Sequence, residues 1–265
     1  MVLQKPLEST CNPFGGVHIM SDSLPEDREE FRLRLSLSID TWRKGGLKVV
    51  WLNIPISKAD LVPIAVGSDF SYHHAGEDYL LLTKRLDHDA LVPQFASHYI
   101  GAGGVVLNTN NDLLVVSERH RRNMDQPSYK LPGGALYAGE HLSEAVVREV
   151  REETGVQTRF DAVVAMRNMH GYRYGKSDIY VVCRLIPITT NITIQPEEIE
   201  ECMWMPVLDY LNSLQVSVFN KRIVQAALNS QGLKHTRVHG LDDSEKHEIF
   251  LPHQCTKPNH TPCGY

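Results

Sequence analysis

Three glutamates lie close together in the segment 148–155, at a spacing that suits metal chemistry. Glu149, Glu152 and Glu153 occupy positions i, i+3 and i+4, so a helix would place their side chains on one face. Like charges at this spacing repel one another, and a cation between them would relieve the repulsion. Mg²⁺ and Mn²⁺ suit carboxylate oxygens, and Mg²⁺ is usually shared between one or two carboxylates and substrate phosphates. The pattern therefore predicts a divalent metal site for phosphate chemistry, with an ordinary solvated helix face as the alternative.

The residues around these glutamates have the pattern of one amphipathic helix preceded by a tight turn. Gly155, just after the last glutamate, is a favourable left-handed end for a helix. His141 or Ser143 stands where the helix would begin. Gly133 and Gly134 have no Cβ, so the backbone there can approach both a metal and a ligand. The apolar stripe that would bury the helix consists of Leu142, Ala145, Val146 and Val150.

The segment from Gly134 to Val156, called the Nudix box below, resembles in full the signature of the Nudix hydrolases. That signature is a Gly, five residues, Glu, seven residues, and then Arg-Glu-apolar-x-Glu-Glu-x-Gly-apolar, and this sequence fills every fixed position. The resemblance implies an enzyme that depends on Mg²⁺ or Mn²⁺ and hydrolyses a diphosphate bond by attack of metal-activated water. The implied partner is a small-molecule diphosphate substrate.

The resemblance also implies roles for individual residues of the box. Arg148 is expected to pair with Glu140 or Glu149 and to fix its geometry, while Glu140 supports the loop. Arg148 and Glu140 are therefore predicted to be catalytic residues, together with Glu149, Glu152 and Glu153. The implied metal ligands are the carbonyl of Gly133 and the carboxylates of Glu149, Glu152 and Glu153.

A further metal ligand or general base is expected in the stretch 196–199. Some Nudix hydrolases place such a residue in the region that Glu198 matches. A loop carboxylate without this role is the alternative, and Glu197 and Glu201 compete for the assignment. The residue that takes the proton from water stays open, because Nudix enzymes differ on it.

Residues outside the metal site are expected to contact the substrate. Arg119 begins the basic run 119–122 after a probable strand, and a solvated surface cluster is an equal alternative to phosphate binding. Lys176 either lines the pocket or only shapes a turn, and Tyr172 is able to stack on a base. The predicted substrate-binding residues are Gly134, Arg119, Tyr172 and Lys176.

More of the chain, roughly 42–229, resembles one branch of the Nudix hydrolases. That branch contains the fibroblast-growth-factor antisense gene product and plant enzymes that act on ADP-ribose and NADH. It favours a nucleoside diphosphate linked to another moiety as substrate. Non-nucleotide diphosphates, such as inositol pyrophosphates or prenyl diphosphates, and a nucleotide-binding regulatory module stay open as alternatives. Beyond the box, the resemblance is carried by Val50–Pro55, Tyr72–Ala75, Ala96–His98 and Gly175–Asp178.

The order of sequence patterns predicts two domains between loosely held ends. The helical spacing of Phe31, Leu35 and Ile39 and the apolar run at 49–52 indicate a small α/β domain. Short strands and helices follow from Pro93, and the Nudix resemblance implies an α/β/α sandwich with a mixed sheet there. The predicted regions are a flexible tail at 1–23, the small α/β domain at 24–92, the Nudix domain at 93–229 and a flexible C-terminal tail at 230–265.

The composition argues against several classes of protein. A formal net charge of −5 over 265 residues disfavours a broad nucleic-acid-binding face, because phosphate neutralisation needs clustered Lys and Arg. No stretch approaches the roughly 20 apolar residues that span a bilayer, so no membrane partner is expected. Five scattered cysteines suit a reducing compartment, and the cytoplasm is the expected location. The oligomeric state stays open, with a homodimer as one candidate.

Overall fold

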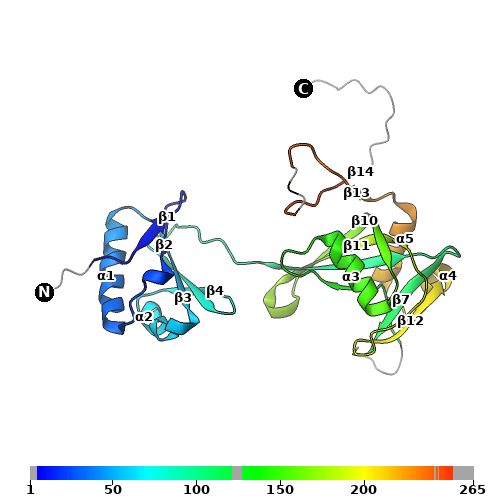
Figure 1. Ribbon diagram of the computed structural model, residues 1–265, viewed down its shortest axis with the longest axis horizontal. Coiled ribbons are helices and arrows are strands. Elements are labelled where there is room, and N and C mark those ends of the chain that lie inside the picture. Colours follow the sequence, from blue (N-terminus) through cyan, green and yellow to red (C-terminus); the bar gives the residue numbers. More distant parts are fainter. Residues whose placement is uncertain (1–4, 121–126, 242, 244, 253–265) are drawn as a thin grey trace, which may run out of the picture. The chain divides into compact units, whose positions relative to one another are not determined.

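The chain divides into two compact units, Met1–Ser97 and His98–Tyr265, whose elements are labelled in Figure 1. The computed structural model describes residues 5–120, 127–241, 243 and 245–252. The boundary falls a few residues later than the predicted one at Pro93, because Phe95 stacks on His74 of the first unit with 3.9 Å between ring centroids. In the described part of the chain, no helix combines the length and apolar content needed to cross a bilayer.

The first unit contains one five-stranded sheet, in the order β1-β2-β3-β5-β4. β2 and β3 run parallel, and the other neighbours run antiparallel. The strands are β1 (Ser9–Cys11), β2 (Gly16–Ile19), β3 (Val49–Pro55), β4 (Ser71–Ala75) and β5 (Tyr79–Arg85). The helices are α1 (Arg28–Lys44) and α2 (Val62–Gly67), with 3-10 segments η1 (Ser21–Ser23) and η2 (Ile56–Leu61).

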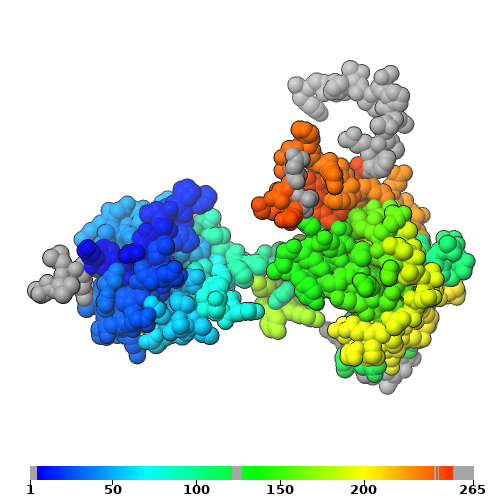
Figure 2. All heavy atoms as spheres, viewed as in Figure 1, coloured from blue at the N-terminus to red at the C-terminus, as the bar shows by residue number. Residues whose placement is uncertain are grey.

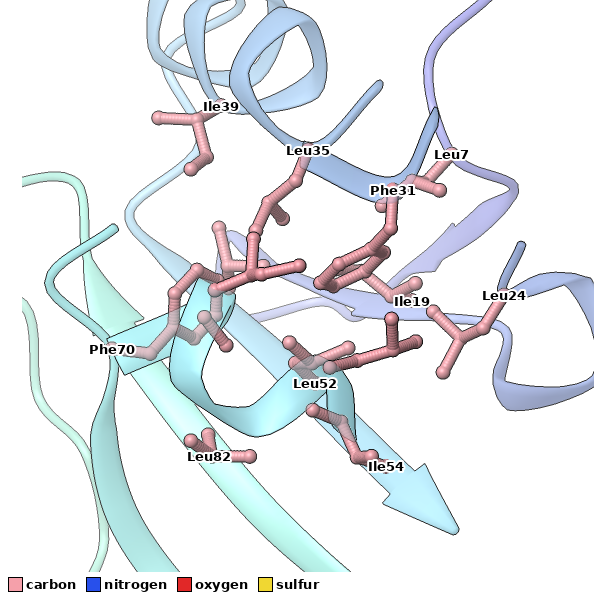
Figure 3. Packing of buried hydrophobic residues seen from close by; sticks show 14 of the residues in the cluster. Leu7, Ile19, Leu24, Phe31, Leu35, Ile39, Leu52, Ile54, Phe70 and Leu82 are labelled. Carbon is pink, nitrogen blue, oxygen red and sulfur yellow. The ribbon is translucent and has the colours of Figure 1, made fainter. Parts of the chain in front are cut away.

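Helix α1 forms where its apolar spacing predicted it. The Asp27 side chain accepts a hydrogen bond from the Glu30 N–H at 2.7 Å and caps the first turn. Phe31 and Leu35 are fully buried, and Figure 3 shows them pointing toward Leu52 of the sheet. Burying each side chain of this size is worth roughly 1.5–3 kcal/mol, so this stripe fixes the helix on one face of the sheet.

The predicted flexible tail before Leu24 is wrong for the described residues of that segment. β1 and β2 belong to the sheet, and Val17 and Ile19 are buried in its core. The Leu7 N–H also donates to the Ser38 hydroxyl of α1 at 2.7 Å. The sequence did not show these strands, because β2 pairs with β3, a strand distant along the chain. Residues 1–4 of the predicted tail lie outside the described residues.

The second unit carries two sheets, in the orders β14-β13-β10-β11-β6-β9 and β12-β7-β8. β11 and β6 run parallel whereas their other neighbours run antiparallel, so the larger sheet is mixed as predicted. The strands are β6 (His98–Val106), β7 (Asp112–Glu118), β8 (Tyr129–Lys130), β9 (Gly133–Ala135), β10 (Thr158–Met169), β11 (Ser177–Pro187), β12 (Ile199–Pro206), β13 (Leu233–His235) and β14 (Phe250–Pro252).

Helices cover both faces of the larger sheet, which confirms the α/β/α sandwich. Val106 of β6 and Cys183 of β11 share a core with helix α3. Their neighbours Val105 and Val182 share the opposite core with helix α5, because successive residues of a strand point to opposite faces. The helices of this unit are α3 (Leu142–Thr154), α4 (Val207–Asn212) and α5 (Val218–Asn229), with the 3-10 segment η3 (Arg173–Gly175).

A tight turn at residues 108–112 joins β6 to β7, but the two strands separate beyond it. The Asn108 N–H donates to the Asp112 carbonyl at 3.0 Å, and Leu107 and Leu113 form an isolated bridge. Asn111 has a φ of 61°, a left-handed conformation that asparagine tolerates. β6 then continues into the larger sheet and β7 into the smaller one, so the hairpin joins the two sheets.

The predicted flexible C-terminal tail is also wrong over part of its length. β13 pairs with β10 at Leu233, and β14 pairs with β13. In Figure 2 the orange residues of this segment lie against the green body of the same unit. The Ser143 N–H donates to Glu248 Oε1 at 3.3 Å, whereas the N-cap residue His141 makes no side-chain cap bond. A carboxylate from the C-terminal segment thus caps α3. Residues 253–265 lie outside the described residues.

Replacing Glu248 by alanine is expected to loosen the first turn of α3. The change removes an acceptor and a negative charge from a helix N-terminus, which together are worth about 0.5–1 kcal/mol. Amide hydrogen exchange at Ser143 and the following residues should accelerate in Glu248→Ala. It should be unaltered in the control Glu245→Ala, since Glu245 is exposed. Equal exchange in Glu248→Ala and the unmodified chain would contradict this account of the cap.

Candidate active site

Helix α3 carries Glu149, Glu152 and Glu153, as the spacing of these glutamates predicted. It ends at Gly155, whose φ of 73° is left-handed. A Cβ at Gly155 would also lie 2.9 Å from the Thr193 carbonyl oxygen, so conformation and space both require glycine there. The opposite side of the helix is anchored in the core by the fully buried Ala145, Val146 and Val150.

The guanidinium of Arg148 forms ion pairs with three of the box carboxylates. Its Nε and Nη2 donate to the two oxygens of Glu140 at 2.7 and 2.9 Å. Its Nη1 donates to Glu149 Oε1 and to Glu152 Oε2, each at 2.9 Å. The expected contacts of Arg148 with Glu140 and Glu149 are therefore present, and a third carboxylate joins them. Bidentate, charge-assisted bonds of this kind fix the geometry of the groups they join.

Glu140 ties Arg148 to the loop ahead of the helix. Hydrogen bonds from Arg148 hold the pKa of Glu140 below its usual value, and the Tyr137 N–H, which donates to Glu140 Oε2 at 3.0 Å, acts in the same direction. The guanidinium lies 4.2 Å from the centre of the Tyr137 ring and donates to the Ala135 carbonyl at 3.2 Å. The loop and the helix are thus locked together through one ion pair.

Glu153 is the most deeply buried of the box carboxylates, with 5% of its surface exposed. The Gly133 N–H donates to its Oε2 at 2.9 Å, and Lys130 Nζ lies 3.9 Å from its Oε1. Burial raises the pKa of Glu153 to about 7, and Lys130 and the Gly133 N–H oppose that rise only in part. The ionised form of this side chain therefore lacks sufficient positive charge around it.

Glu149 lies directly against the backbone of Gly134. A Cβ at Gly134 would be 2.5 Å from Glu149 Oε2, so a larger residue would displace the carboxylate. Burial raises the pKa of Glu149, Arg148 lowers it, and the neighbouring charge of Glu152 raises it further. Because Gly134 has no side chain, the Glu149 carboxylate has room against its backbone.

Glu198 and its competitor Glu201 have different surroundings. The charge of Glu198 contributes to the raised pKa of Glu149, which places the two groups within electrostatic reach. Glu201 instead accepts a hydrogen bond from the Tyr129 hydroxyl at 2.9 Å. The use of Glu198 as a metal ligand or base stays a prediction.

The charges of this cluster do not balance within the described residues. Two negative charges remain after the ion pairs are counted, because four carboxylates share two cations. A divalent cation fits this donor set, since hard ions bind carboxylate oxygens. Among the described residues, no three carboxylate, imidazole or thiolate groups are arranged so that they could hold a metal ion by themselves. The groups counted are Glu140, Glu149, Glu152, Glu153, Lys130 and Arg148.

A pocket of about 330 Å³ opens beside the carboxylates, within the second unit. Gly133, Gly134 and Lys130 line it, and these are the residues that contact Glu153 and Glu149. The pocket therefore borders the carboxylate cluster. Its longer side chains are the cationic Lys130, Arg167 and Arg173, the acidic Glu118 and Asp178, and the aromatic Tyr99, Tyr172 and Tyr180.

Arg167 and Tyr180 are held in fixed positions in this pocket. Arg167 Nη2 lies 2.6 Å from Asp178 Oδ2, and its guanidinium lies 5.5 Å from the centre of the Tyr180 ring. A Cβ at Gly103 would be 1.8 Å from the Tyr180 hydroxyl. The absence of a side chain at Gly103 thus lets the hydroxyl of Tyr180 occupy this place.

The opposite part of the pocket is aromatic. The rings of Tyr99 and Tyr172 meet edge to face, with 6.0 Å between their centres. The Arg173 guanidinium lies 5.4 Å from the centre of the Tyr172 ring, and Lys176 Nζ lies 5.8 Å from that of Tyr99. Such an arrangement offers flat apolar surface together with positive charge.

Of the four predicted substrate-binding residues, two line the pocket and two do not. Gly134 and Tyr172 line the pocket, whereas Lys176 contacts Tyr99 without being part of the lining. Arg119 is exposed, and its Nε donates to the Pro196 carbonyl at 2.7 Å. Arg119 therefore supports the loop that carries Glu198. Substrate contact by all four stays a prediction, and residues 121–122 of the basic run lie outside the described residues.

The fold brings to the pocket several residues that the sequence did not indicate. Arg167 and Tyr180 stand opposite each other in the pairing of β10 with β11, a register that neither segment shows alone. Lys130 and Glu118 are joined through the pairing of β7 with β8. The one local signal was the position of Lys130 three residues before Gly133.

Two family models match this chain, one for each unit. The model described as "Nudix hydrolase domain" matches residues 7–86, and the model described as "NUDIX domain" matches residues 97–227. The sandwich and its box helix thus define a Nudix domain. The chain belongs to the Nudix hydrolase family.

Curated relatives from plants and animals cover most of the chain. Nudix hydrolase 2 of Arabidopsis thaliana is 40% identical, over 78% of this chain and 74% of the relative. Nudix hydrolase 8 of the same plant is 37% identical over 77% of this chain, but the match spans only 56% of the relative. The human protein Nucleoside diphosphate-linked moiety X motif 6 is 32% identical, over 84% of this chain and 72% of the relative. Among solved structures, the MutT protein of Methanosarcina mazei is 21% identical, over 50% of this chain and 94% of that chain, with a TM-score of 0.42.

The raised pKa of Glu153 predicts how the metal-free protein responds to pH. Its folded-state pKa of about 7 exceeds the ordinary value of 4.5, so the folded state retains a proton that the unfolded state loses between these values. The free energy of unfolding should therefore fall as pH rises through this window. The full cost of ionising Glu153 in the folded state should be present above about pH 7. Replacing Glu153 by glutamine removes this cost of ionisation, which is at most about 3 kcal/mol.

The measurement is denaturant unfolding in EDTA at pH values above and below this window. Glu153→Gln should be more stable than the unmodified chain on the alkaline side, and the difference should vanish on the acidic side. Glu144→Gln is the control, because Glu144 lies exposed on the same helix. A Glu153→Gln protein that is less stable than the unmodified chain at every pH would show that Glu153 is not short of positive charge.

Proposed function

We propose that this chain hydrolyses a diphosphate bond in a nucleoside diphosphate linked to another moiety, with Mg²⁺ or Mn²⁺ as the cofactor. The observation that carries this proposal is the set of buried carboxylates with too little positive charge, directly beside a pocket with cationic and aromatic walls. A divalent cation would balance the charge of the carboxylates, and the cationic side chains of the pocket would balance that of the substrate phosphates. Membership of the Nudix hydrolase family supports the same reaction.

The box carboxylates would hold the metal, and Arg148 would hold the carboxylates. Glu149, Glu152 and Glu153 are the proposed ligands, with the Gly133 carbonyl and Glu198 as further ones. A bound divalent cation lowers the pKa of a coordinated water and neutralises charge on a leaving phosphate. Arg148 bonds to Glu149 and Glu152, so its part is to keep these groups aligned while the cation is bound.

The pocket supports a nucleotide over a purely aliphatic substrate. Tyr99 and Tyr172 offer ring surface for stacking a base. Lys130 and Arg173 carry charge suited to phosphate oxygens. We therefore place the diphosphate near Lys130 and Gly134, and the base near the two tyrosines. ADP-ribose and NADH are the proposed substrates, in line with the words nucleoside diphosphate-linked moiety in the name of the human relative.

The test is a panel of diphosphates incubated with Mg²⁺ or Mn²⁺ and scored for products by chromatography. ADP-ribose and NADH should be cleaved between their phosphates, and Glu152→Gln should lose at least about a hundredfold in turnover, as for removal of a charge-stabilising group. Glu144→Gln, on the same helix but exposed, should retain activity.

Inositol pyrophosphates and prenyl diphosphates belong in the same panel. Turnover of these compounds alone would contradict a nucleotide substrate while retaining the diphosphate reaction. Tight binding of nucleotides with no turnover of any compound would instead identify a binding module. Full activity of Glu152→Gln would remove the proposed metal site from the reaction.

A further inference from the structure

The first unit contains a pocket of its own, unrelated to the carboxylate helix. Its volume is about 550 Å³, within the range of small-molecule sites. It lies on the face of the five-stranded sheet away from α1. Leu52 of β3 points toward α1 in Figure 3, and its neighbour Trp51, which lines the pocket, faces the other way because strand residues alternate.

The roof of this pocket is the segment 90–93, and it is held at both ends. The Arg85 Nε–H donates to the Ala90 carbonyl at 3.0 Å. His73 Nε2 lies 2.7 Å from the Pro93 carbonyl oxygen, which makes His73 the donor there. The pocket is therefore already formed, and little of its shape has to be ordered when a ligand binds.

A chain of hydrogen bonds fixes the proton that His73 donates to Pro93. His73 Nδ1 lies 2.7 Å from His74 Nδ1, and since Nε2 of neutral His73 carries its proton, Nδ1 accepts. His74 then donates from Nδ1 and accepts from the Tyr79 hydroxyl at its Nε2, 3.0 Å away. The His-His pair of the segment 72–75 thus holds the pocket roof in place.

The polar groups of the pocket floor and wall are hydrogen-bond donors. Asn12 Oδ1 accepts from the N–H groups of Phe14 and Gly16, so its amide nitrogen faces His18 Nε2, at 3.3 Å. His18 Nε2 is therefore the acceptor, and its Nδ1 carries the proton. Burial lowers the pKa of His18, which favours this neutral form.

Two more donors line the pocket without a protein partner in the described part of the chain. They are the indole N–H of Trp51 and the ammonium of Lys48. The carboxylate that lines the rim, Asp89, lies 3.1 Å from His88 Nδ1 and is 93% exposed, so water screens its charge. A ligand would therefore have to supply hydrogen-bond acceptors and, at Lys48, negative charge.

The remaining wall of the pocket is apolar and flat. Trp51 stacks on His18 with 5.6 Å between ring centres and 7° between planes. Phe14 and Leu91 line the pocket although each is 86% exposed, so a flat ligand would remove much apolar surface from water.

We propose that this pocket is a second ligand site, which takes a planar heteroaromatic ring carrying an anionic group. The ring would cover Phe14, and acceptor atoms at its edge would meet the indole N–H of Trp51 and the Nδ1–H of His18. The anion would pair with Lys48. This inference does not depend on the reaction proposed for the second unit.

The test uses AMP as a planar heteroaromatic anion, with adenosine and ribose 5-phosphate as probes that lack the anion or the ring. Indole N–H signals are followed by NMR in the full chain with EDTA present. The three tryptophans report on separate places, because Trp42 is in the first core and Trp204 is in the second unit. AMP should shift the Trp51 signal saturably and leave that of Trp42 in place, and Trp51→Phe assigns the signal.

Lys48→Gln should weaken AMP binding about tenfold, the factor for one charge-assisted bond, and should leave adenosine binding unchanged. Lys44→Gln is the matched control, since Lys44 is exposed and does not line the pocket. A Trp51 signal that does not move at millimolar AMP would overturn the proposal. So would a signal that responds to dilution of the protein alone, because the occupant would then be a second copy of the chain.

Discussion

The second unit depends on one electrostatic constraint, the confinement of several carboxylates around a single guanidinium. Arg148 bonds to three glutamates at once, and Glu153 is buried, with Lys130 Nζ 3.9 Å from its Oε1. Burying a carboxylate without full compensation is costly, so ionised Glu153 is expected to lower the stability of the metal-free fold. A cost of this kind at the edge of a cavity is typical of sites that are completed by a ligand.

The rest of the unit is arranged to hold that cluster in place. The apolar side of α3 packs on the larger sheet, and Glu248 from the C-terminal segment caps its first turn. β9 brings the two glycines against Glu149 and Glu153. Because glycine leaves the backbone bare, these carboxylates can pack against main chain, and the pocket can reach them.

Local features were predicted well from the sequence, and features that depend on distant pairing were not. The amphipathic spacing of α3, its glycine end and the shared face of its glutamates are all written within one short segment, and the structure has them. Arg167 and Tyr180 reach the pocket only through the register of two strands, which no single segment encodes. β2 was not predicted for the same reason. Its sequence is short and begins beside a glycine, and it forms a strand by pairing with β3, which is distant along the chain.

Anomalous diffraction from crystals soaked in Mn²⁺ shows whether the box glutamates hold a divalent cation. An anomalous peak is expected in contact with carboxylate oxygens of Glu149, Glu152 and Glu153, beside the pocket that Gly133 and Gly134 line. Ordered glutamates with no peak between them at saturating Mn²⁺ would contradict this role of the glutamates.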